Sequence, residues 1–502
     1  MTRPGAPTIA GARKPARIGD LMRTLDFDLA DRALFVRLFG GDVYAVGGYV
    51  RDLIRGRPSP DVDILVARHS LEEIVRKLGR HGRVDLVGRS FGIIKFTVRG
   101  RTYDVALPRT DSPRGEGVRG HKDILVRADP GLPVEKDLER RDFRTNSMAL
   151  RLKDGTLIDP FEGRADTLAR RIRLTNPAAF PDDPLRVMRV ARFASVLGFK
   201  VDPAIYPAAR AADLSGLSVE RVNDEMFKLL LGSARPSAGL EEMFRLGVLE
   251  QWFPELQALA LVIQDSVFHP EKDDHGHHTV WAHTKLSVDQ AAALSRLAGL
   301  PEPRKLALLL AALYHDIGKV TTTRWEFKRG RMAVTSCGHD IQSERAARRV
   351  ISRFRVQAWN GFAIGRTVPL LIRTHHRASE LWQNREGVTK KAFNRLAADV
   401  QGEIELLVYL DAADRAGRGT RLVRTLDKQA RWLFKKFEEL RVNRETIKPL
   451  VMGRDLIKLG VPPGPEMGRL LKKLYKVQLD NGFENKAGGL EKARRLIERK
   501  AT

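Results

Sequence analysis

The chain has 502 residues, and its 88 Lys and Arg against 62 Asp and Glu give a net charge of +26 at pH 7. Hydrophobic residues make up 43% of it, which excludes wholesale disorder and fits about three domains. The longest apolar run, residues 306–314, is too short for a membrane span, and the single cysteine, Cys337, excludes an intramolecular disulfide. Composition therefore predicts a cytoplasmic protein with neither a membrane nor a disulfide-linked partner, whose charge favours a nucleic acid.

The N-terminal part is predicted to fold as a mixed α/β domain over residues 23–165, after a disordered basic tail at 1–22 that lacks the apolar stretch of a secretory signal. A loop rich in Gly, Pro and charge is expected at 108–133. Short apolar runs that predict strands lie at 42–46, 62–66, 83–87, 93–98 and 102–106, with a helical pattern at 70–78.

The rest of the chain shows helical patterns almost throughout. Helices are predicted at 183–197, 219–231 and 240–246, and basic helical stretches at 431–440 and 470–478. The fold class is therefore α+β, with an α/β head followed by an all-helical body. The predicted helical parts are a neck at 166–262, a body at 263–420 and a C-terminal region at 421–502.

Paired carboxylates mark the head. Asp61 and Asp63 stand two residues apart on a predicted strand, so their side chains face the same way. Neighbouring carboxylates repel one another unless a divalent cation lies between them, and Asp104 on another predicted strand offers a third ligand. Alone, a D-x-D pair is more often ordinary solvated charge.

The segment VGGYVRD at residues 46–52 precedes this pair. Gly47 and Gly48 let the backbone approach a ligand closely, Arg51 complements phosphate, and Asp52 completes the segment. Glycines, arginine and paired carboxylates within so few residues predict a two-metal site for phosphoryl or nucleotidyl transfer.

Two further charged clusters follow. Arg140 and Arg141 can neutralise a triphosphate, while Asp142 and Asn146 can hydrogen-bond ribose hydroxyls. In isolation this cluster is typical of a charged helix start.

The second cluster opens a predicted helix. Asp183 is a predicted N-cap before Pro184, and three arginines follow at steps of three, so they line one side of the helix with Asp183. An Asp accepts from the exocyclic amino group of cytosine or adenine, and an Arg donates to the neighbouring ring nitrogen, so one such pair accepts C and A and rejects U and G. The alternative is a helix-capping salt bridge. The arginines are Arg186, Arg189 and Arg192.

Together these segments resemble the class II tRNA nucleotidyltransferase and poly(A) polymerase family, which builds or repairs the 3′ CCA end of tRNA without a template. The matching segments are VGGYVRD at 46–52, DVD at 61–63, RRDF at 140–143 with Asn146, DPF at 159–161, DPLRVMRVARF at 183–193 and ERVNDEMFKLL at 220–230. Arg144, where the family usually has Thr, and Ser147, where Ala is common, depart from the pattern and bear on fine specificity.

The resemblance implies that Asp61 and Asp63 hold Mg²⁺, and that a tRNA 3′-hydroxyl attacks the α-phosphate of CTP or ATP. It also implies that Gly48 and Arg51 contact the nucleotide, that Arg141 and Asp142 hold ribose and phosphate, and that Asp183 and Arg186 read the base with help from Arg189 and Arg192. Alternative products are a poly(A) tail, A alone or CC alone. The length of the 108–133 loop argues weakly against CC alone.

Histidines gather in the predicted body, where most of the 12 lie between residues 269 and 376. His269 and His278 are expected to be ordinary core residues. The ordered set His283, His315-Asp316 and Asp414 resembles the HD phosphohydrolase superfamily, and His339 and His375 fit its two-metal version. His376 competes with His375 and Asp411 with Asp414.

This second resemblance implies a divalent metal of unknown identity and a phosphatase or phosphodiesterase activity on RNA ends. An inactive, RNA-binding HD fold is the alternative for this region. For the whole chain, the alternative of another class is an HD phosphohydrolase whose head merely binds RNA. The C-terminal region resembles the family's tRNA-binding part. The sequence does not fix the oligomeric state.

Overall fold

The computed structural model describes residues 29–57, 61–87, 93–113, 124–328, 330–440 and 448–501. It divides into two compact units. The first comprises the described residues up to Glu225 together with Glu242–Gln251, and the second comprises Met226–Glu241 and the described residues from Trp252 onward. None of the described helices is long and apolar enough to cross a bilayer.

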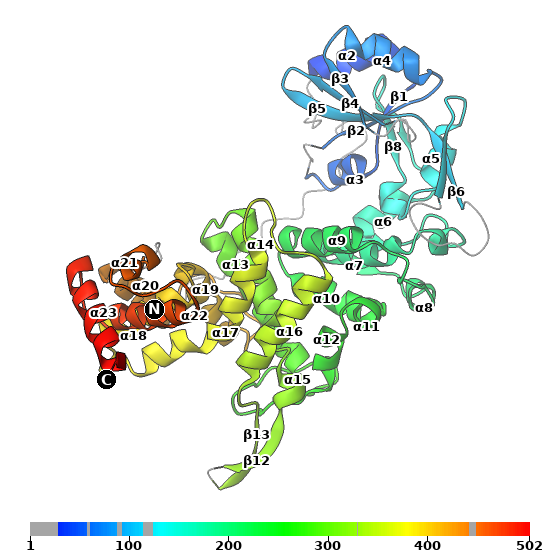
Figure 1. Ribbon diagram of the computed structural model, residues 1–502. Helices are drawn as coiled ribbons and strands as arrows, with labels where there is room; N and C mark the ends of the chain where they lie inside the picture. The colour runs from blue at the N-terminus through cyan, green and yellow to red at the C-terminus, as the bar shows by residue number, and fades with distance from the viewer. Residues whose placement is uncertain are drawn as a thin grey trace, which may run out of the picture. The chain divides into compact units, whose positions relative to one another are not determined.

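The first unit is built on a seven-stranded mixed sheet (Figure 1). All neighbouring strands are antiparallel except β2 and β5, which run parallel. In spatial order the strands are β3 (Arg83–Val87), β4 (Ile93–Val98), β5 (Arg101–Ala106), β2 (Asp63–Val66), β1 (Val43–Val46), β8 (Ala149–Arg151) and β9 (Leu157–Ile158). The head helices are α2 (Leu29–Phe39), α3 (Gly48–Ile54), α4 (Leu71–Gly79), α5 (Val134–Glu139) and α6 (Gly163–Ala169).

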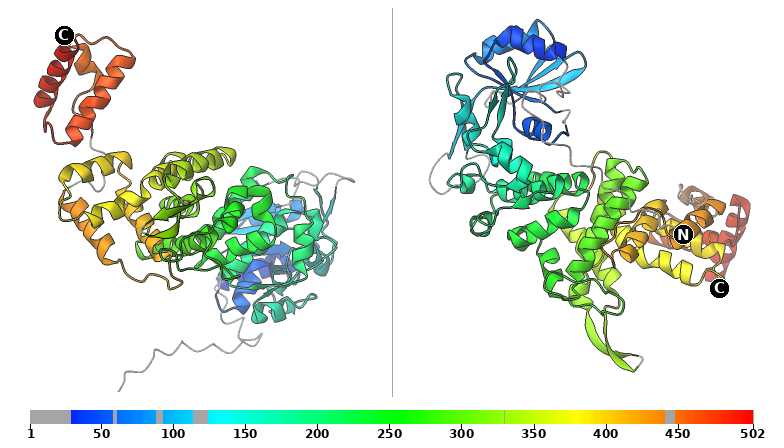
Figure 2. Two further views of the ribbon diagram at one scale, coloured as in Figure 1. Left: turned by 90° about the horizontal axis from the view of Figure 1, so that it is seen from below. Right: turned by 180° about the vertical axis from the view of Figure 1, so that it is seen from behind.

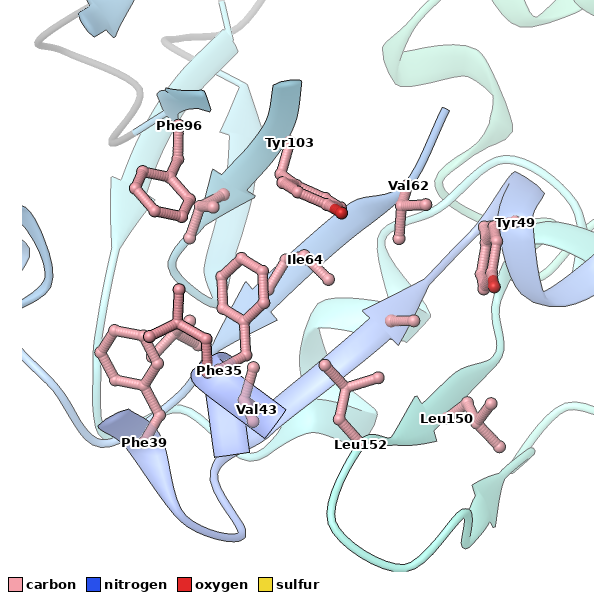
Figure 3. Packing of buried hydrophobic residues seen from close by; sticks show 14 of the residues in the cluster. Phe35, Phe39, Val43, Tyr49, Val62, Ile64, Phe96, Tyr103, Leu150 and Leu152 are labelled. Atoms are coloured by element: carbon pink, nitrogen blue, oxygen red, sulfur yellow. The ribbon is translucent and has the colours of Figure 1, made fainter. Parts of the chain in front are cut away.

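Within this sheet, β1 is buried on both faces, which explains why it is uniformly apolar. On one face, Phe35 of α2 packs edge-on against Phe96 and Tyr103, with ring centroids 5.9 and 5.4 Å apart (Figure 3). On the other face, Leu138 of α5 packs in a cluster with Val46. Strand β1 thus packs on both sides, with Val43 and Ala45 in one cluster and Tyr44 and Val46 in the other.

The chain continues into helices with clear local signals. Gly198, with φ of +68°, ends α7 in the left-handed conformation that favours glycine. These helices are α7 (Leu185–Leu197), α8 (Ile205–Arg210), α9 (Val219–Gly232), α10 (Pro236–Arg245), α11 (Val248–Trp252) and α12 (Pro254–Gln257); single 3₁₀ turns lie at Arg144–Asn146, Phe180–Asp182 and Ala258–Leu261.

The second unit is a bundle of packed helices (Figure 2). Thr279 caps the first of them, because its side chain accepts from the Ala282 N–H. The bundle helices are α13 (Val280–Leu297), α14 (Glu302–Tyr314), α15 (Lys319–Thr322), α16 (His339–Arg353), α17 (Ile364–Gln383), α18 (Lys390–Asp399), α19 (Ile404–Ala416) and α20 (Lys428–Glu439). Three C-terminal helices follow: α21 (Gly453–Ile457), α22 (Pro465–Leu479) and α23 (Lys486–Ala501).

The α+β prediction is confirmed, with three local corrections. Strands β6 (Arg109–Pro113) and β7 (Ile124–Ala128) form an antiparallel hairpin within the predicted 108–133 loop. The helical part contains a short parallel pair, β10 (Arg171–Ile172) and β11 (Lys200–Val201), and a hairpin of β12 (Arg324–Lys328) and β13 (Arg331–Thr335). The predicted tail at 1–22 and residues 114–123 lie outside the described residues, and the domain boundaries remain predictions.

Candidate active sites

The carboxylates of the head meet at the start of β2. Asp63 opens this strand, and the parallel register places it directly beside Asp104 of β5, while Asp61 lies just before the strand instead of on it. Lys95 of β4 donates to Asp104 Oδ1 at 2.8 Å. The Asp63 side chain is exposed, but desolvation by the surrounding protein atoms, together with the Asp104 and Asp61 carboxylates, raises the pKa of Asp63 even though Arg141 opposes the shift. This repulsion between carboxylates is what a bound divalent cation relieves, so the residues fit Mg²⁺.

Gly47 brings the backbone close to this cluster. Its φ is +70°, and a Cβ built on it would lie 2.7 Å from Arg141 Nη1 and 3.7 Å from Asp63 Oδ2. Any side chain would therefore displace Arg141 from beside Asp63. Asp137 of α5, which is fully buried, holds this guanidinium at 3.2 Å and that of Arg140 at 2.8 Å.

Arg51 begins a chain of polar contacts within the first unit. Its Nη1 donates to Asn146 Oδ1 at 2.6 Å and its Nη2 to Asp52 Oδ2 at 2.7 Å. Asn146 Nδ2 donates in turn to Asp142 Oδ1 at 3.0 Å. The fold thus joins four of the predicted nucleotide-binding residues from two separate segments.

Helix α7 completes this chain. Burial alone would raise the pKa of Asp142, but Arg189, which donates to its Oδ2 at 2.7 Å, and Asn146 hold that pKa below its usual value. Arg192 pairs with Glu225 at 2.5 Å, and Arg186 donates to the carbonyl oxygens of Ala179 and Arg140.

Asp183 lies in extended backbone two residues before α7, whose N-cap is Pro184 instead of the predicted Asp183. The Asp183 side chain nevertheless accepts from the Leu185 N–H at 3.3 Å. Its carboxylate is also 3.2 Å from Arg221 of α9. Sequence reasoning did not assign Arg221 or Glu225 a role. Their spacing of four on a helix, inside a segment already matched to the family, was the available signal.

The second unit brings together all six residues predicted for its site: His283, His315, Asp316, His339, His375 and Asp414, here named the HD centre. His283 Nε2 lies 2.9 Å from Asp414 Oδ1, and His315 Nε2 lies 3.3 Å from Asp316 Oδ2. His339 Nε2 lies 3.4 Å from Asp316 Oδ1. Helices α13, α14, α16, α17 and α19 each supply or adjoin a member of the set.

Three of these imidazoles are oriented in the same way. The Nδ1 atoms of His315, His339 and His375 each lie 2.6–2.8 Å from the carbonyl oxygen three residues earlier. The Nε2 atoms of His315 and His339 face the carboxylate of Asp316. His375 Nε2 is buried with no hydrogen-bond partner among the described residues, and burial holds the pKa of His375 well below its usual value. A buried neutral imidazole that offers a lone pair fits a divalent metal.

The structure separates the competing aspartates but not the competing histidines. Asp411 accepts from Ser379, Arg415 and Gln429, away from the HD centre. His376 Nε2 lies 2.9 Å from His339 Nε2, so both His375 and His376 contribute ring nitrogens to the group.

Glu271 was missed by sequence reasoning. It lies 2.9 Å from His283 Nδ1 and 3.0 Å from His269 Nδ1. Burial opposes the charged form of Glu271, but the two imidazoles lower its pKa to about 2. His269, expected to be an ordinary core residue, therefore adjoins the centre, whereas the side chain of His278 contacts the Glu271 carbonyl oxygen at 3.0 Å. Lys319 also reaches Asp316, at 2.8 Å.

Comparison with known proteins gives a consistent result along the chain. Family models match in three places: the poly A polymerase head domain at residues 43–173, the probable RNA and SrmB-binding site of polymerase A at 198–259, and the HD domain at 280–416.

Among solved structures, the Bacillus stearothermophilus CCA-adding enzyme in complex with CTP aligns with a TM-score of 0.58 and 22% identity, over 94% of this chain and 98% of that one. The Thermotoga maritima CCA-adding enzyme complexed with tRNA aligns with a TM-score of 0.53 and 18% identity, over 96% and 98%. At such identities these structures establish the fold.

Relatives with a higher sequence identity establish the family as well as the fold. The chain is 35% identical to the multifunctional CCA protein of Stenotrophomonas maltophilia, over 63% of this chain and 72% of the relative. It is 34% identical to that of Methylococcus capsulatus, over 86% of this chain and 92% of the relative. With the matched head, RNA-binding and HD regions in this order, the chain belongs to the family of multifunctional CCA proteins.

Proposed function

We propose that the chain adds C, C and A to the 3′ end of tRNA, using CTP and ATP. The observation that carries the proposal is the placement of Asp63 beside Asp104, with Gly47 and Arg141 against them. The names of the relatives, and the CTP, ATP and tRNA complexes of structurally similar enzymes, support it.

Each part of the head site has a task in this reaction. The carboxylates of Asp61, Asp63 and Asp104 would hold Mg²⁺, which when bound activates the attacking hydroxyl and neutralises the leaving pyrophosphate. Arg141 supplies positive charge for the triphosphate beside the backbone of Gly47. Arg51 is fixed in one orientation by Asp52 and Asn146, so it meets the nucleotide without first losing side-chain entropy.

Base selection falls to helix α7. Asp183 offers a carboxylate that accepts from an amino group, and the guanidinium of Arg186, held by two backbone carbonyls, donates to the adjacent ring nitrogen. Arg189 and Arg192, fixed by Asp142 and Glu225, hold this face of the helix in place.

The test uses purified protein, Mg²⁺ and three tRNA transcripts that end before CCA, after CC and after CCA. Each is incubated with CTP, ATP or both, and the product mass is measured. We expect C, C and A to be added to the first and nothing to the last. Addition of A alone to the second would make the protein an A-adding enzyme, and long A tails would make it a poly(A) polymerase.

A second activity is favoured by the HD centre. We infer that it hydrolyses a terminal phosphate or a 2′,3′-cyclic phosphate on RNA, with a divalent metal held by its six residues. The observation that carries this proposal is the buried Nε2 of His375, which has no hydrogen-bond partner in the part of the chain that the structure describes. The test is phosphate release from RNA bearing each end group, before and after chelation and with single metals restored. Release that survives complete chelation would contradict it.

The remaining proposals follow from the substrate. tRNA is used in the cytoplasm, which is therefore where we propose the protein acts. The basic C-terminal helices α22 and α23 are suited to grip the tRNA backbone through phosphates, a contact that weakens with salt.

A further inference from the structure

The β12–β13 hairpin exposes an apolar face. Its register pairs Trp325 with Val334 and Phe327 with Met332, so these four side chains share one face. Trp325 is 66% exposed and Phe327 is 73% exposed. Within the described residues each strand pairs only with the other, and the hairpin projects away from α15 and α16 (Figures 1 and 2). Large aromatic side chains on a two-stranded ribbon gain little from folding, which indicates a face that a partner covers.

The base of the hairpin is fastened to the HD centre. The hydroxyls of Thr323 and Ser336 lie 2.9 Å apart and close the base of the ribbon. The Ser336 carbonyl holds His339 Nδ1 at 2.7 Å, and the Thr323 hydroxyl donates to the Lys319 carbonyl at 2.7 Å. Arg331 pairs with the buried Asp265 at 2.8 Å. The ribbon is thus positioned by residues that adjoin the candidate metal ligands.

Charge identifies the kind of partner. The other face of the ribbon carries three cations, Arg324, Lys328 and Arg331, of which Lys328 pairs with Glu326 at 2.6 Å and Arg331 with Asp265 at 2.8 Å. The ribbon itself therefore keeps a net positive charge, with one acid against three cations. A second copy of this chain would bring a further +26 of the same sign, whereas a nucleic acid brings phosphates. Aromatic residues flanked by basic ones suit unpaired bases, which stack on the rings while the phosphates meet the cations.

The spacing of the two rings agrees with this partner. Residues two apart on one strand are separated by about 6.8 Å, which is about twice the distance between stacked bases. One base can therefore lie between the side chains of Trp325 and Phe327, or a base can stack on each.

We propose that the β12–β13 hairpin is a stacking surface for the unpaired bases next to the 3′ end of an RNA, and that it delivers the end phosphate to the HD centre. The role in delivery rests on the proposed hydrolytic function, whereas the binding itself does not.

The experiment measures binding of a short unstructured RNA with a 3′-phosphate to the full-length chain. Affinity is followed by fluorescence anisotropy, and a 4-thiouridine near the 3′ end is photocrosslinked and mapped by mass spectrometry. The variant W325A/F327A removes both rings, W325F/F327Y keeps two aromatic rings, and L297A removes an exposed apolar side chain elsewhere in the same unit as the matched control. Thermal unfolding confirms that each variant is folded.

We expect crosslinks to hairpin peptides and at least a tenfold weaker affinity for W325A/F327A, with W325F/F327Y and L297A within twofold of the wild type. Equal affinity of W325A/F327A, or crosslinks only elsewhere, would overturn the proposal. Self-association of the wild type that W325A/F327A abolishes, with RNA affinity unchanged, would instead make this face an interface between copies. If the wild type releases no phosphate but the affinity still falls, the hydrolytic function fails and the stacking surface stands.

Discussion

Asp63 is a carboxylate whose charged form the head disfavours. Desolvation by the surrounding protein atoms and the neighbouring Asp104 and Asp61 raise its pKa. A carboxylate kept in such surroundings is a candidate for a functional role. Replacement of Asp63 should therefore lower the activity of the head site without lowering the stability of the fold.

For Asp63→Asn we expect nucleotide addition to fall by about 1,000-fold, because a ligand that neutralises the transferred phosphates is lost. The melting temperature should stay the same or rise, since removal of the charge relieves repulsion. The matched control is Asp85→Asn, on β3 of the same sheet, where the carboxylate pairs only with Arg83 among the contacts described. A large fall in melting temperature with Asp63→Asn would contradict this account.

Asp414 and Asp411 provide a second comparison of single residues, three positions apart on α19. Asp414 lies 2.9 Å from His283, whereas Asp411 accepts from Ser379 and Gln429. We expect Asp414→Asn to abolish metal binding and phosphate release. Asp411→Asn should retain metal while losing about 1–3 kcal/mol of stability, because buried donors lose a charged acceptor. Metal content and thermal unfolding of both variants check this, and metal loss by Asp411→Asn alone would reverse the assignment.

At the scale of elements, the turn between β1 and α3 determines how closely the backbone at Gly47 approaches Arg141 and Asp63. For Gly47→Ala we expect nucleotide addition to fall by at least about 100-fold, since the methyl group would displace Arg141. The control is Gly100→Ala in the turn between β4 and β5. Its φ of +76° likewise favours glycine, but nothing lies within 4 Å of the added methyl group. Equal loss of activity in both variants would show that strain alone is responsible.

Asp137 of helix α5 forms ion pairs with Arg140 and Arg141, and the strength of these ion pairs depends on pH. Arg141 and Arg140 lower the pKa of Asp137 against the effect of burial. A carboxyl group whose pKa is lowered by folding stabilises the folded chain at pH values above the ordinary carboxyl pKa. This stabilisation is lost as the pH falls through the pKa that the group has in the folded chain. The difference in melting temperature between wild type and Asp137→Asn should therefore be largest near pH 7 and should narrow between pH 5 and pH 3. A difference that does not change with pH would mean that the charge of Asp137 contributes nothing.

The elements of the head were predictable because its buried strands carry local signals. The apolar runs at 83–87 and 93–98 coincide with β3 and β4, and the other three predicted strands begin within a residue of β1, β2 and β5. Strands β8 and β9 of the same sheet were not predicted. The hairpin β12–β13 was missed, although residues 324–328 alternate charged and apolar side chains as a strand with one apolar face does. The alternation covers only five residues and stands within a part of the chain whose other patterns are helical.

The site residues also divide into those that local sequence motifs predicted and those that they did not. Dense sequence motifs contain Asp63, Gly47 and His315-Asp316, so the sequence was sufficient to predict a functional role for these residues. Glu271 was not, because its role comes from a tertiary contact with His283, twelve positions away across an irregular segment. The pairing of Asp183 with Arg221 likewise depends on how α7 and α9 pack. Such contacts leave no periodic pattern in one sequence.

At the scale of the whole molecule, the head site and the HD centre belong to different compact units. Each unit has a hydrophobic core of its own, so each site is supported locally. Chemistry at one site should therefore survive damage to the other, as in an enzyme that first clears an RNA end and then extends it.

Reciprocal variants test this separation. We expect the double variant H315A/D316A to lose phosphate release and HD-bound metal while adding nucleotides at the wild-type rate, because its changes lie in the second unit. Asp63→Asn should do the reverse. Both activities are measured on one preparation of each variant, with tRNA lacking CCA and with RNA ending in a cyclic phosphate. If H315A/D316A slowed nucleotide addition as much as phosphate release, the two units would act as one catalytic body, since damage confined to the HD centre would then reach the carboxylates of the head.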